Sequence, residues 1–132
     1  MAGEAAAVLV AGFHQALNGG DVERLVGLAR EDVELVGPRG TARGVELLRE
    51  WVGRAGITLT PRRTFARGQT VVVEEDASWR DPHTGEAQEA QVVATAFDLR
   101  EGRIARISRL PDLKSALRAA GMEARDEVPQ SG

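Results

Sequence analysis

The stretch Ala16-Leu17-Asn18-Gly19-Gly20-Asp21 ends one amphipathic pattern and begins another. The apolar residues before it recur at helical spacing: Ala5, Val8, Leu9, Gly12, Phe13, Ala16 and Leu17. The Asn-Gly-Gly run disfavours any continuation of this helix. Asp21 stands at an N-cap position, and the short apolar pattern after it ends near Arg30. Two consecutive helices are therefore predicted at the start of the chain.

Beyond these helices the pattern changes to a strand, a third helix and then a run of strands. Val33 to Val36 predicts a short strand, and Val45 to Val52 predicts a helix that ends before Gly56. From Ile57 onward, alternating apolar and polar residues predict four strands of a meander. The expected turns are at Arg67-Gly68, at Asp81-Pro82-His83-Thr84-Gly85 and at Arg100-Glu101-Gly102.

Length and composition favour one domain. A chain of 132 residues with 42% hydrophobic content supports a single core. A last helix is expected over Leu113 to Ala120, so the domain is assigned to residues 1–121 and a flexible polar tail to residues 122–132.

The charge and the apolar pattern disfavour several classes of partner. A net charge of -3 disfavours nucleic acid and anionic membranes. The longest apolar stretch, Ala5 to Phe13, is too short for a bilayer crossing, and Glu4 stands where a secretion signal carries basic residues. A cytoplasmic protein is therefore expected. Because the chain lacks cysteine, thiolate chemistry and disulfides are excluded.

Four short stretches, taken in order, resemble the nuclear-transport-factor-2-like superfamily over roughly residues 5 to 118. They are Ala16-Leu17-Asn18-Gly19-Gly20-Asp21, Asp32-Val33-Glu34-Leu35, Gly44 and Glu101-Gly102-Arg103-Ile104. The superfamily includes ketosteroid isomerases, SnoaL-like polyketide cyclases and limonene epoxide hydrolases. The resemblance implies an α+β fold: a cone-shaped barrel of cystatin-like topology, in which a curved antiparallel sheet packs on three N-terminal helices around an apolar pocket. This fold hosts enzymes and non-enzymes alike.

The catalytic groups of two well-understood relatives are missing here. Aligned on the resemblance, the tyrosine, the aspartate base and the protonated aspartate of ketosteroid isomerase correspond to Phe13, Leu35 and Val93. Hydrocarbon side chains cannot supply those protons and hydrogen bonds, so isomerase chemistry by that mechanism is not expected. The arginine and two aspartates of limonene epoxide hydrolase correspond to Glu75, Ala77 and Arg109, which also argues against that mechanism.

The alternation of the second long strand supplies a candidate of its own. Val71, Val73, Glu75, Ala77 and Trp79 share one strand face, which the apolar members assign to the core. A carboxylate on such a face is costly to bury without a partner, and Arg109 on the last strand is the partner we expect. Glu75 would then be a general base and Arg109 an anchor for an anionic or carbonyl-bearing ligand. A purely structural ion pair, or side chains at a solvent-exposed rim, is the alternative.

The two histidines are weaker candidates. His14 follows Phe13 by one residue and so lies about 100° around the helix from the pocket line, which predicts a position on the helix flank. His83 belongs to an expected hairpin loop. Two histidines at this separation form no metal motif, and neither a metal nor another cofactor is expected.

Two function classes follow from these observations, with non-catalytic ligand binding ahead of catalysis. The ligand would be a small apolar or carbonyl-bearing molecule. The residues expected to line its pocket are Phe13, Leu35, Trp51, Trp79, Val93 and Phe97. The opposite face of the fourth of these strands is also apolar and predicts a homodimer interface, formed by Ala90, Val92, Ala94 and Ala96.

Overall fold

The computed structural model of the chain describes residues 2–37, 40–55, 57–79, 84, 86 and 90–128. Four α-helices, one 3-10 helix and seven strands are formed within these ranges. Their bounds, in chain order, are α1 Ala2–Asn18, α2 Val22–Gly27, β1 Ala29–Gly37, β2 Gly40–Arg43, α3 Val45–Ala55, β3 Ile57–Arg67, β4 Thr70–Trp79, β5 Gln91–Arg100, β6 Arg103–Leu110, α4 Leu113–Ala120, η1 Ala124–Asp126 and β7 Glu127–Val128. The predicted α+β class is confirmed.

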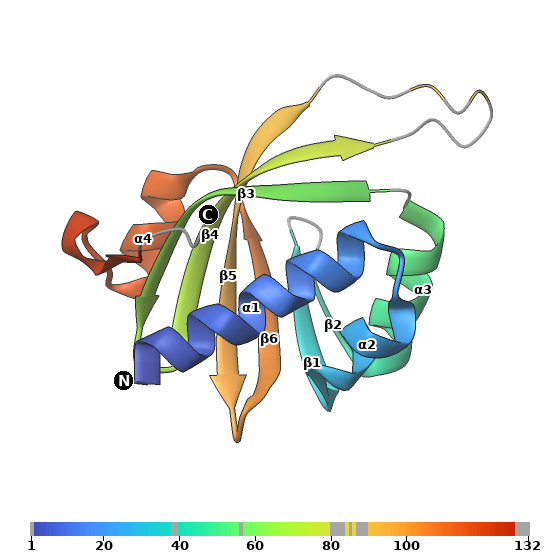
Figure 1. Cartoon of the computed structure of the whole chain (residues 1–132), viewed down its shortest axis with the longest axis horizontal. Helices are drawn as coiled ribbons and strands as arrows, with labels where there is room; N and C mark the ends of the chain where they lie inside the picture. The colour runs from blue at the N-terminus through green and yellow to red at the C-terminus, as the bar shows by residue number, and fades with distance from the viewer. Residues whose placement is uncertain are drawn as a thin grey trace.

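The strands form one curved sheet in the order β2-β1-β6-β5-β4-β3-β7 (Figure 1). The four long strands β3 to β6 are a meander of antiparallel neighbours, as predicted. The sheet is not antiparallel throughout, however, because β1 pairs with β6 in parallel. This pairing brings β1, which precedes the meander in the sequence, beside β6, the last long strand.

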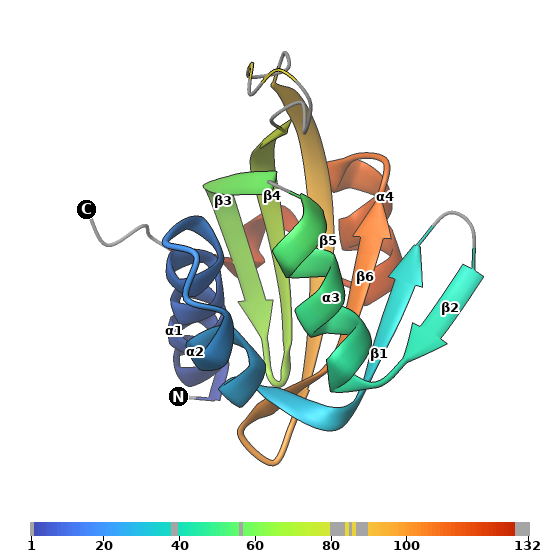
Figure 2. The ribbon, with the colours of Figure 1, turned by 90° about the vertical axis from the view of Figure 1, so that its right-hand side faces the viewer.

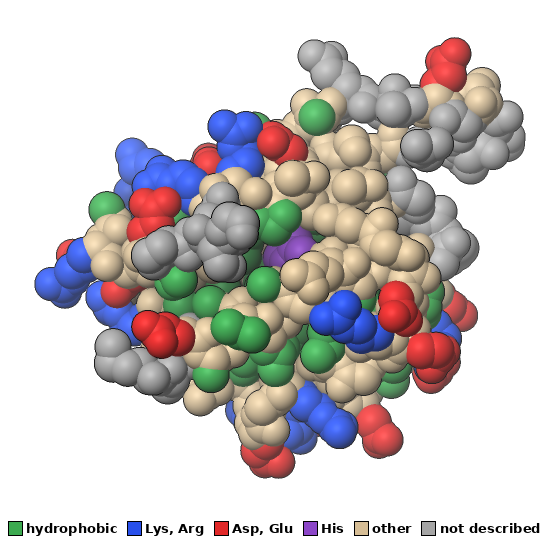
Figure 3. Space-filling model, viewed as in Figure 1, with side chains coloured by type: hydrophobic (Ala, Val, Ile, Leu, Met, Phe, Trp, Pro, Cys, Tyr) green, Lys and Arg blue, Asp and Glu red, His purple; other side chains and the backbone are tan. Residues whose placement is uncertain are grey.

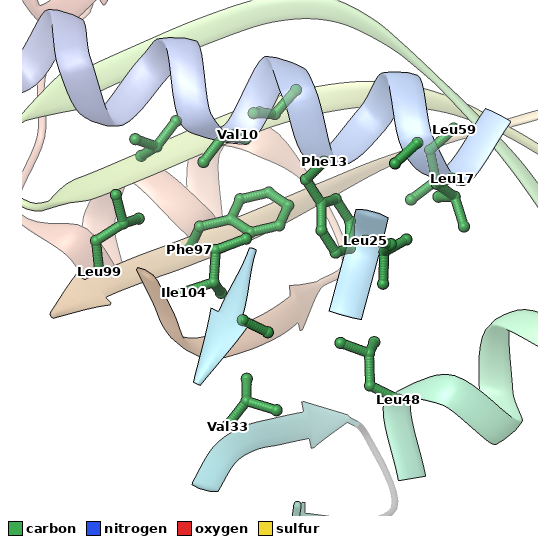
Figure 4. Close-up of a cluster of buried hydrophobic side chains, with 14 of the residues drawn as sticks. Val10, Phe13, Leu17, Leu25, Val33, Leu48, Leu59, Phe97, Leu99 and Ile104 are labelled. Atoms are coloured by element: carbon green, nitrogen blue, oxygen red, sulfur yellow. The ribbon is translucent and has the colours of Figure 1, made fainter. Parts of the chain in front are cut away.

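Helices cover both faces of the sheet. Helices α1, α2 and α3 lie on one side, whereas α4 lies on the other (Figure 2). The main core lies between α1 to α3 and the sheet, and Figure 4 shows Phe13 from α1 and Phe97 from β5 near its centre. Burial of these apolar side chains is the main force that holds the two layers together.

Helix α1 is rotated from the orientation that its apolar pattern predicted. The buried residues of its inward stripe are Ala6, Val10, Phe13, His14, Ala16 and Leu17. Val8 is 72% exposed, although the predicted stripe included it. The helix contains more apolar residues than its buried face can hold, so apolar spacing alone did not fix the rotation.

The end of α1 is joined to the sheet by one side chain. The side-chain NH2 group of Asn18 donates to the Leu59 carbonyl oxygen at 2.9 Å, and the side-chain oxygen of Asn18 accepts from the Leu59 backbone N–H at 3.0 Å. Asn18 therefore supplies both halves of a backbone-like pairing to β3. Asp21 then caps α2 as predicted, accepting from the Arg24 amide at 3.1 Å, although α2 ends at Gly27 rather than near Arg30.

The outer face of β5 is partly covered by the chain itself. Ala94 and Ala96, which were expected at a dimer interface, pack instead in a second apolar cluster beneath α4. The cluster also contains Phe65, Val72, Ala116 and Met122. The apolar pattern did indicate a covered face, but α4 is the cover over these two alanines. Ala90 and Val92 remain exposed.

The segment after α4 continues the fold as far as Val128. Met122 is buried, and β7 pairs antiparallel with β3. Arg63 and Arg67 on β3 form ion pairs with Glu127 and Asp126. This differs from the loose tail expected over residues 122–132, because the polar residues of this segment pair with arginines of the sheet. Residues 129–132 lie outside the described ranges.

The surface mixes both signs of charge. On the face over α1, uncharged and apolar atoms occupy the centre, and acidic and basic side chains gather toward the edges (Figure 3). Across the described part of the chain, no helix has the length and apolar character needed to cross a membrane.

Candidate functional site

A cavity of about 190 Å³ lies between the sheet and the helices. Its described lining residues are Phe13, Leu35, Val36, Gly37, Leu48, Trp51, Leu59, Thr95, Phe97, Ile107 and Arg109. Among them Thr95 and Arg109 have polar side chains, and Trp51 carries an indole N–H donor. A dry cavity of about 150 Å³ is known to hold benzene, so this space suits a compact ligand of about one ring.

The cavity contains four of the six predicted ligand-binding residues in its wall: Phe13, Leu35, Trp51 and Phe97. Trp79 and Val93 are not among the described residues that line it. The Arg109 guanidinium, on β6, crosses β5 and lies over the Trp79 ring on β4, 5.6 Å from its centroid. Arg109 therefore contacts both the cavity and Trp79.

Glu75 is fully buried on β4 and has two hydrogen-bond partners. Its Oε2 contacts His14 Nε2, and its Oε1 accepts a hydrogen bond from Thr95 Oγ1 at 2.6 Å. His14, on α1, is 2% exposed. The inward direction of Glu75 agrees with the alternation of its strand. Its expected partner was wrong: within the described residues Glu75 pairs with His14 rather than with Arg109.

The proton on His14 can be assigned at one nitrogen. Nδ1 lies 2.9 Å from the Val10 carbonyl oxygen, and because that oxygen only accepts, Nδ1 carries a hydrogen. Nε2 then either donates to an ionised Glu75 or accepts from a protonated one. The pair has no net charge in either arrangement, which explains how a carboxyl group and an imidazole can be buried together.

Aromatic rings fix the position of the imidazole. The His14 ring lies edge-on to Phe13 and to Phe97, with centroids 5.8 and 5.7 Å away. Phe13 and Phe97 also pack edge to face, 5.3 Å apart. Since both phenylalanines line the cavity, the same rings form its wall and hold the His14–Glu75 pair in place.

Thr95 connects the buried pair to the cavity. Its side chain lines the cavity, and its hydroxyl bonds to Glu75. A hydroxyl that donates one hydrogen bond still has lone pairs with which to accept another. The series His14, Glu75, Thr95 is therefore a continuous hydrogen-bonded path from α1 to the cavity. Along this path a proton can pass between the cavity and Glu75 without direct contact between Glu75 and a ligand.

The buried position of His14, though not its partner, could have been predicted from the helix. Val10, His14 and Leu17 are four and three residues apart, so they form one line along α1. The flank position predicted for His14 was wrong because the buried face of α1 is wide enough to include both Phe13 and His14. His83, the other histidine, lies outside the described residues. Among those that are described, no group of three or more potential ligands is placed to hold a metal ion.

Residues 10–107 match the model of a protein family, the SnoaL-like domain. No curated protein matches the chain. Many solved structures have a similar fold. The three described next are under 25% identical to this chain, so they bear on the fold alone.

Three of these structures are similar to this chain over most of its length. A candidate polyketide cyclase from Xanthomonas campestris pv. campestris has a TM-score of 0.74 at 21% identity, over 87% of this chain and 96% of its own. TerC, co-crystallised with polyporic acid, has a TM-score of 0.71 at 20% identity, over 87% and 96%. A protein of ketosteroid isomerase-like fold from Catenulispora acidiphila, in complex with trimethylamine, has a TM-score of 0.67 at 22% identity, over 89% and 95%.

Proposed function

Because the chain belongs to the SnoaL-like domain family, we propose that it binds a compact, mainly apolar small molecule in the cavity between its helices and its sheet. The observation that carries this proposal is the cavity itself: about 190 Å³ of space with a wall that is apolar except at Thr95, Arg109 and the indole N–H of Trp51. Two of the structural relatives were crystallised with small molecules, which agrees with such a role.

Gly37 offers a direct test of the binding proposal. It lines the cavity, and a Cβ added there would meet open space. Gly37→Leu is expected to fill part of the cavity and to abolish binding of single-ring probes such as benzene, while Gly37→Ala retains it. Binding can be followed by calorimetry on folded proteins. Equal binding by the wild type and Gly37→Leu, or no binding of any probe by the wild type, would contradict the proposal.

The second candidate function is proton-transfer catalysis in the same cavity. It is favoured by one observation, the hydrogen-bonded path from His14 through Glu75 to Thr95. A substrate C–H proton would pass to Thr95 Oγ1 as the hydroxyl proton passes to Glu75 Oε1. Glu75 would be the base in this scheme, as its sequence position suggested, and His14 would be a positioning residue. Arg109 would stabilise negative charge that develops on the ligand.

Exchange of a carbon acid tests this second function without knowledge of the natural substrate. The enzyme is expected to accelerate exchange of the α-protons of cyclohexanone in D2O, measured by proton NMR. Glu75→Gln and Thr95→Val should both remove the acceleration, whereas Ser108→Ala, one residue from Arg109 and outside the cavity lining, should retain it. Binding without any acceleration would leave the first function and reject the second.

We also retain the homodimer and the cytoplasmic location as proposals. Val92 is 49% exposed on the β5 face beyond the alanines that α4 covers, and it supports contact with a second copy of the chain. Sedimentation should give twice the 14.1 kDa chain mass. Val92→Asp should shift the mass toward the monomer, while Leu47→Asp, at another exposed apolar position, should not. A monomer at every concentration would reject the dimer.

A further inference from the structure

Arg109 carries the net charge of the cavity wall. The other lining residues with polar groups, Thr95 and Trp51, are neutral, and the His14–Glu75 pair behind Thr95 has no net charge. No carboxylate among the described residues forms an ion pair with Arg109, whose described contact is the Trp79 ring. The neighbouring arginine on the same strand, Arg106, is paired with Glu34 at 2.9 Å. The charge that Arg109 adds to the cavity is therefore uncompensated by a described acid.

The position of Arg109 suits contact with a ligand at the cavity mouth. It is exposed to solvent and also lines the cavity, so its side chain spans both environments. Its guanidinium carbon lies over the Trp79 ring, 5.6 Å from the ring centroid. A guanidinium that stacks on a ring still has in-plane N–H groups free for two parallel hydrogen bonds. A carboxylate matches that geometry better than a single carbonyl oxygen.

We propose that the cavity selects a monocarboxylate whose apolar body is about one ring, with the ring among the cavity side chains and the carboxylate on Arg109. This inference rests on the proposed binding function and gives its ligand a chemical class. The apolar wall favours the ring, and the uncompensated guanidinium favours the negative charge. Thr95 lies opposite Arg109 in the pairing of β5 with β6, so both polar groups border one end of the bound molecule.

Benzoate and benzamide provide a matched test, since they have nearly the same shape and differ in charge at neutral pH. Trp51 lines the cavity and Trp79 contacts Arg109, so tryptophan fluorescence can report binding. Calorimetry gives an independent measure of the affinity. Benzoate is expected to bind at least about tenfold more tightly than benzamide in low salt. The preference should shrink as salt screens the charge.

Substitutions assign the preference to Arg109. Arg109→Gln should reduce the benzoate preference to about unity, and Arg109→Lys should retain part of it. Arg106→Gln is the matched control, because it removes a cation from the same strand outside the cavity lining, and it should leave the preference unchanged. Circular dichroism establishes that each variant is folded.

The possible outcomes separate this inference from the function on which it rests. If benzamide binds as tightly as benzoate, the carboxylate proposal is overturned and the apolar binding function survives. If neither compound nor any other single-ring probe binds, both fail. A benzoate preference that Arg106→Gln removes and Arg109→Gln retains would also overturn the assignment to Arg109.

Discussion

At the scale of single residues, Glu75 can be replaced by an amide without loss of a hydrogen bond. The Gln side-chain oxygen can accept from Thr95, and its NH2 can donate to His14 Nε2 while Nδ1 continues to donate to Val10. Glu75→Gln is therefore expected to change the free energy of unfolding by about 1 kcal/mol or less. Glu75→Leu leaves His14 and Thr95 without their buried partner and should cost about 3 to 5 kcal/mol.

Urea denaturation of the two variants measures this difference. The amide variant is the control for the change in charge, and the leucine variant is the test of the hydrogen bonds. If both variants lost the same stability, the ionised arrangement, in which Glu75 is negative and His14 is positive, would be holding the pair together, and the expected tolerance of the amide would be wrong.

The residue scale also shows how far the sequence could be interpreted. Alternation along β4 correctly placed Glu75 on the inner face, because a strand has a fixed period of two. It could not identify His14 as the partner, since that contact depends on the rotation of α1 against a curved sheet. Arg109 was predicted to be the partner of Glu75 because it is a cation on the last strand, at a position that alternation assigns to the inner face. In the fold it faces the cavity mouth and a tryptophan.

At the scale of elements, Asn18 holds the end of α1 against β3. Asn18→Ala removes both bonds to Leu59 and is expected to destabilise the domain by about 1 to 2 kcal/mol. Asn18→Asp keeps the acceptor but sets a carboxylate against the Leu59 carbonyl, so it should be at least as harmful as alanine. Thermal unfolding of the three proteins tests this order. A fully stable aspartate variant would show that the amide donor contributes nothing.

The β3–β7 contact is expected to weaken in acid. Hydrogen bonding from Arg63 lowers the pKa of Glu127 below its ordinary value of about 4.5. The backbone amide of Glu123 lowers the pKa of Asp126, with a further contribution from Arg67. Because a lowered carboxyl pKa stabilises the folded form above the unfolded pKa, this contribution is full at neutral pH and is lost as the pH falls through the folded pKa values.

Hydrogen exchange measures this loss directly. After correction for intrinsic rates, protection of the β7 amides should be constant from pH 7 to about 5 and should fall below about pH 4. Amides in the centre of β5 are the internal control. They should keep their protection at the pH at which the β7 amides first lose theirs. Arg63→Gln should lower the protection at neutral pH and flatten its dependence on pH. An unchanged profile in that variant would remove Glu127 from the account.

The C-terminal elements also limit what the sequence could predict. The final helix was expected from its apolar spacing, and α4 begins and ends where the pattern placed it, at Leu113 and Ala120. The site where α4 packs was not predicted. The apolar outer face of β5 indicates that this face is covered, but it does not identify the covering element. The polar segment after α4 looked loose for a similar reason: its charges match arginines that are distant in the sequence.

At the scale of the whole molecule, the sheet divides the apolar interior into two cores that share strands. Val71 and Val73 belong to the main core, whereas Val72 between them belongs to the cluster under α4. Damage to either core should therefore destabilise the same strands, and unfolding should remain a single transition. The cavity lies on one side only, so ligand binding should depend on the main core and not on the outer cluster.

Met122→Ala separates these two properties. It removes a buried side chain of the outer cluster and is expected to cost about 2 to 3 kcal/mol in one cooperative transition. The affinity for a cavity probe should stay unchanged, because the sheet stands between Met122 and the cavity. Leu48→Ala is the matched change in the main core, and since Leu48 lines the cavity it should alter both stability and affinity. If Met122→Ala weakened binding as much as Leu48→Ala, the outer cluster would be setting the shape of the cavity through the shared strands, and the two faces of the sheet would have to be treated as one coupled unit.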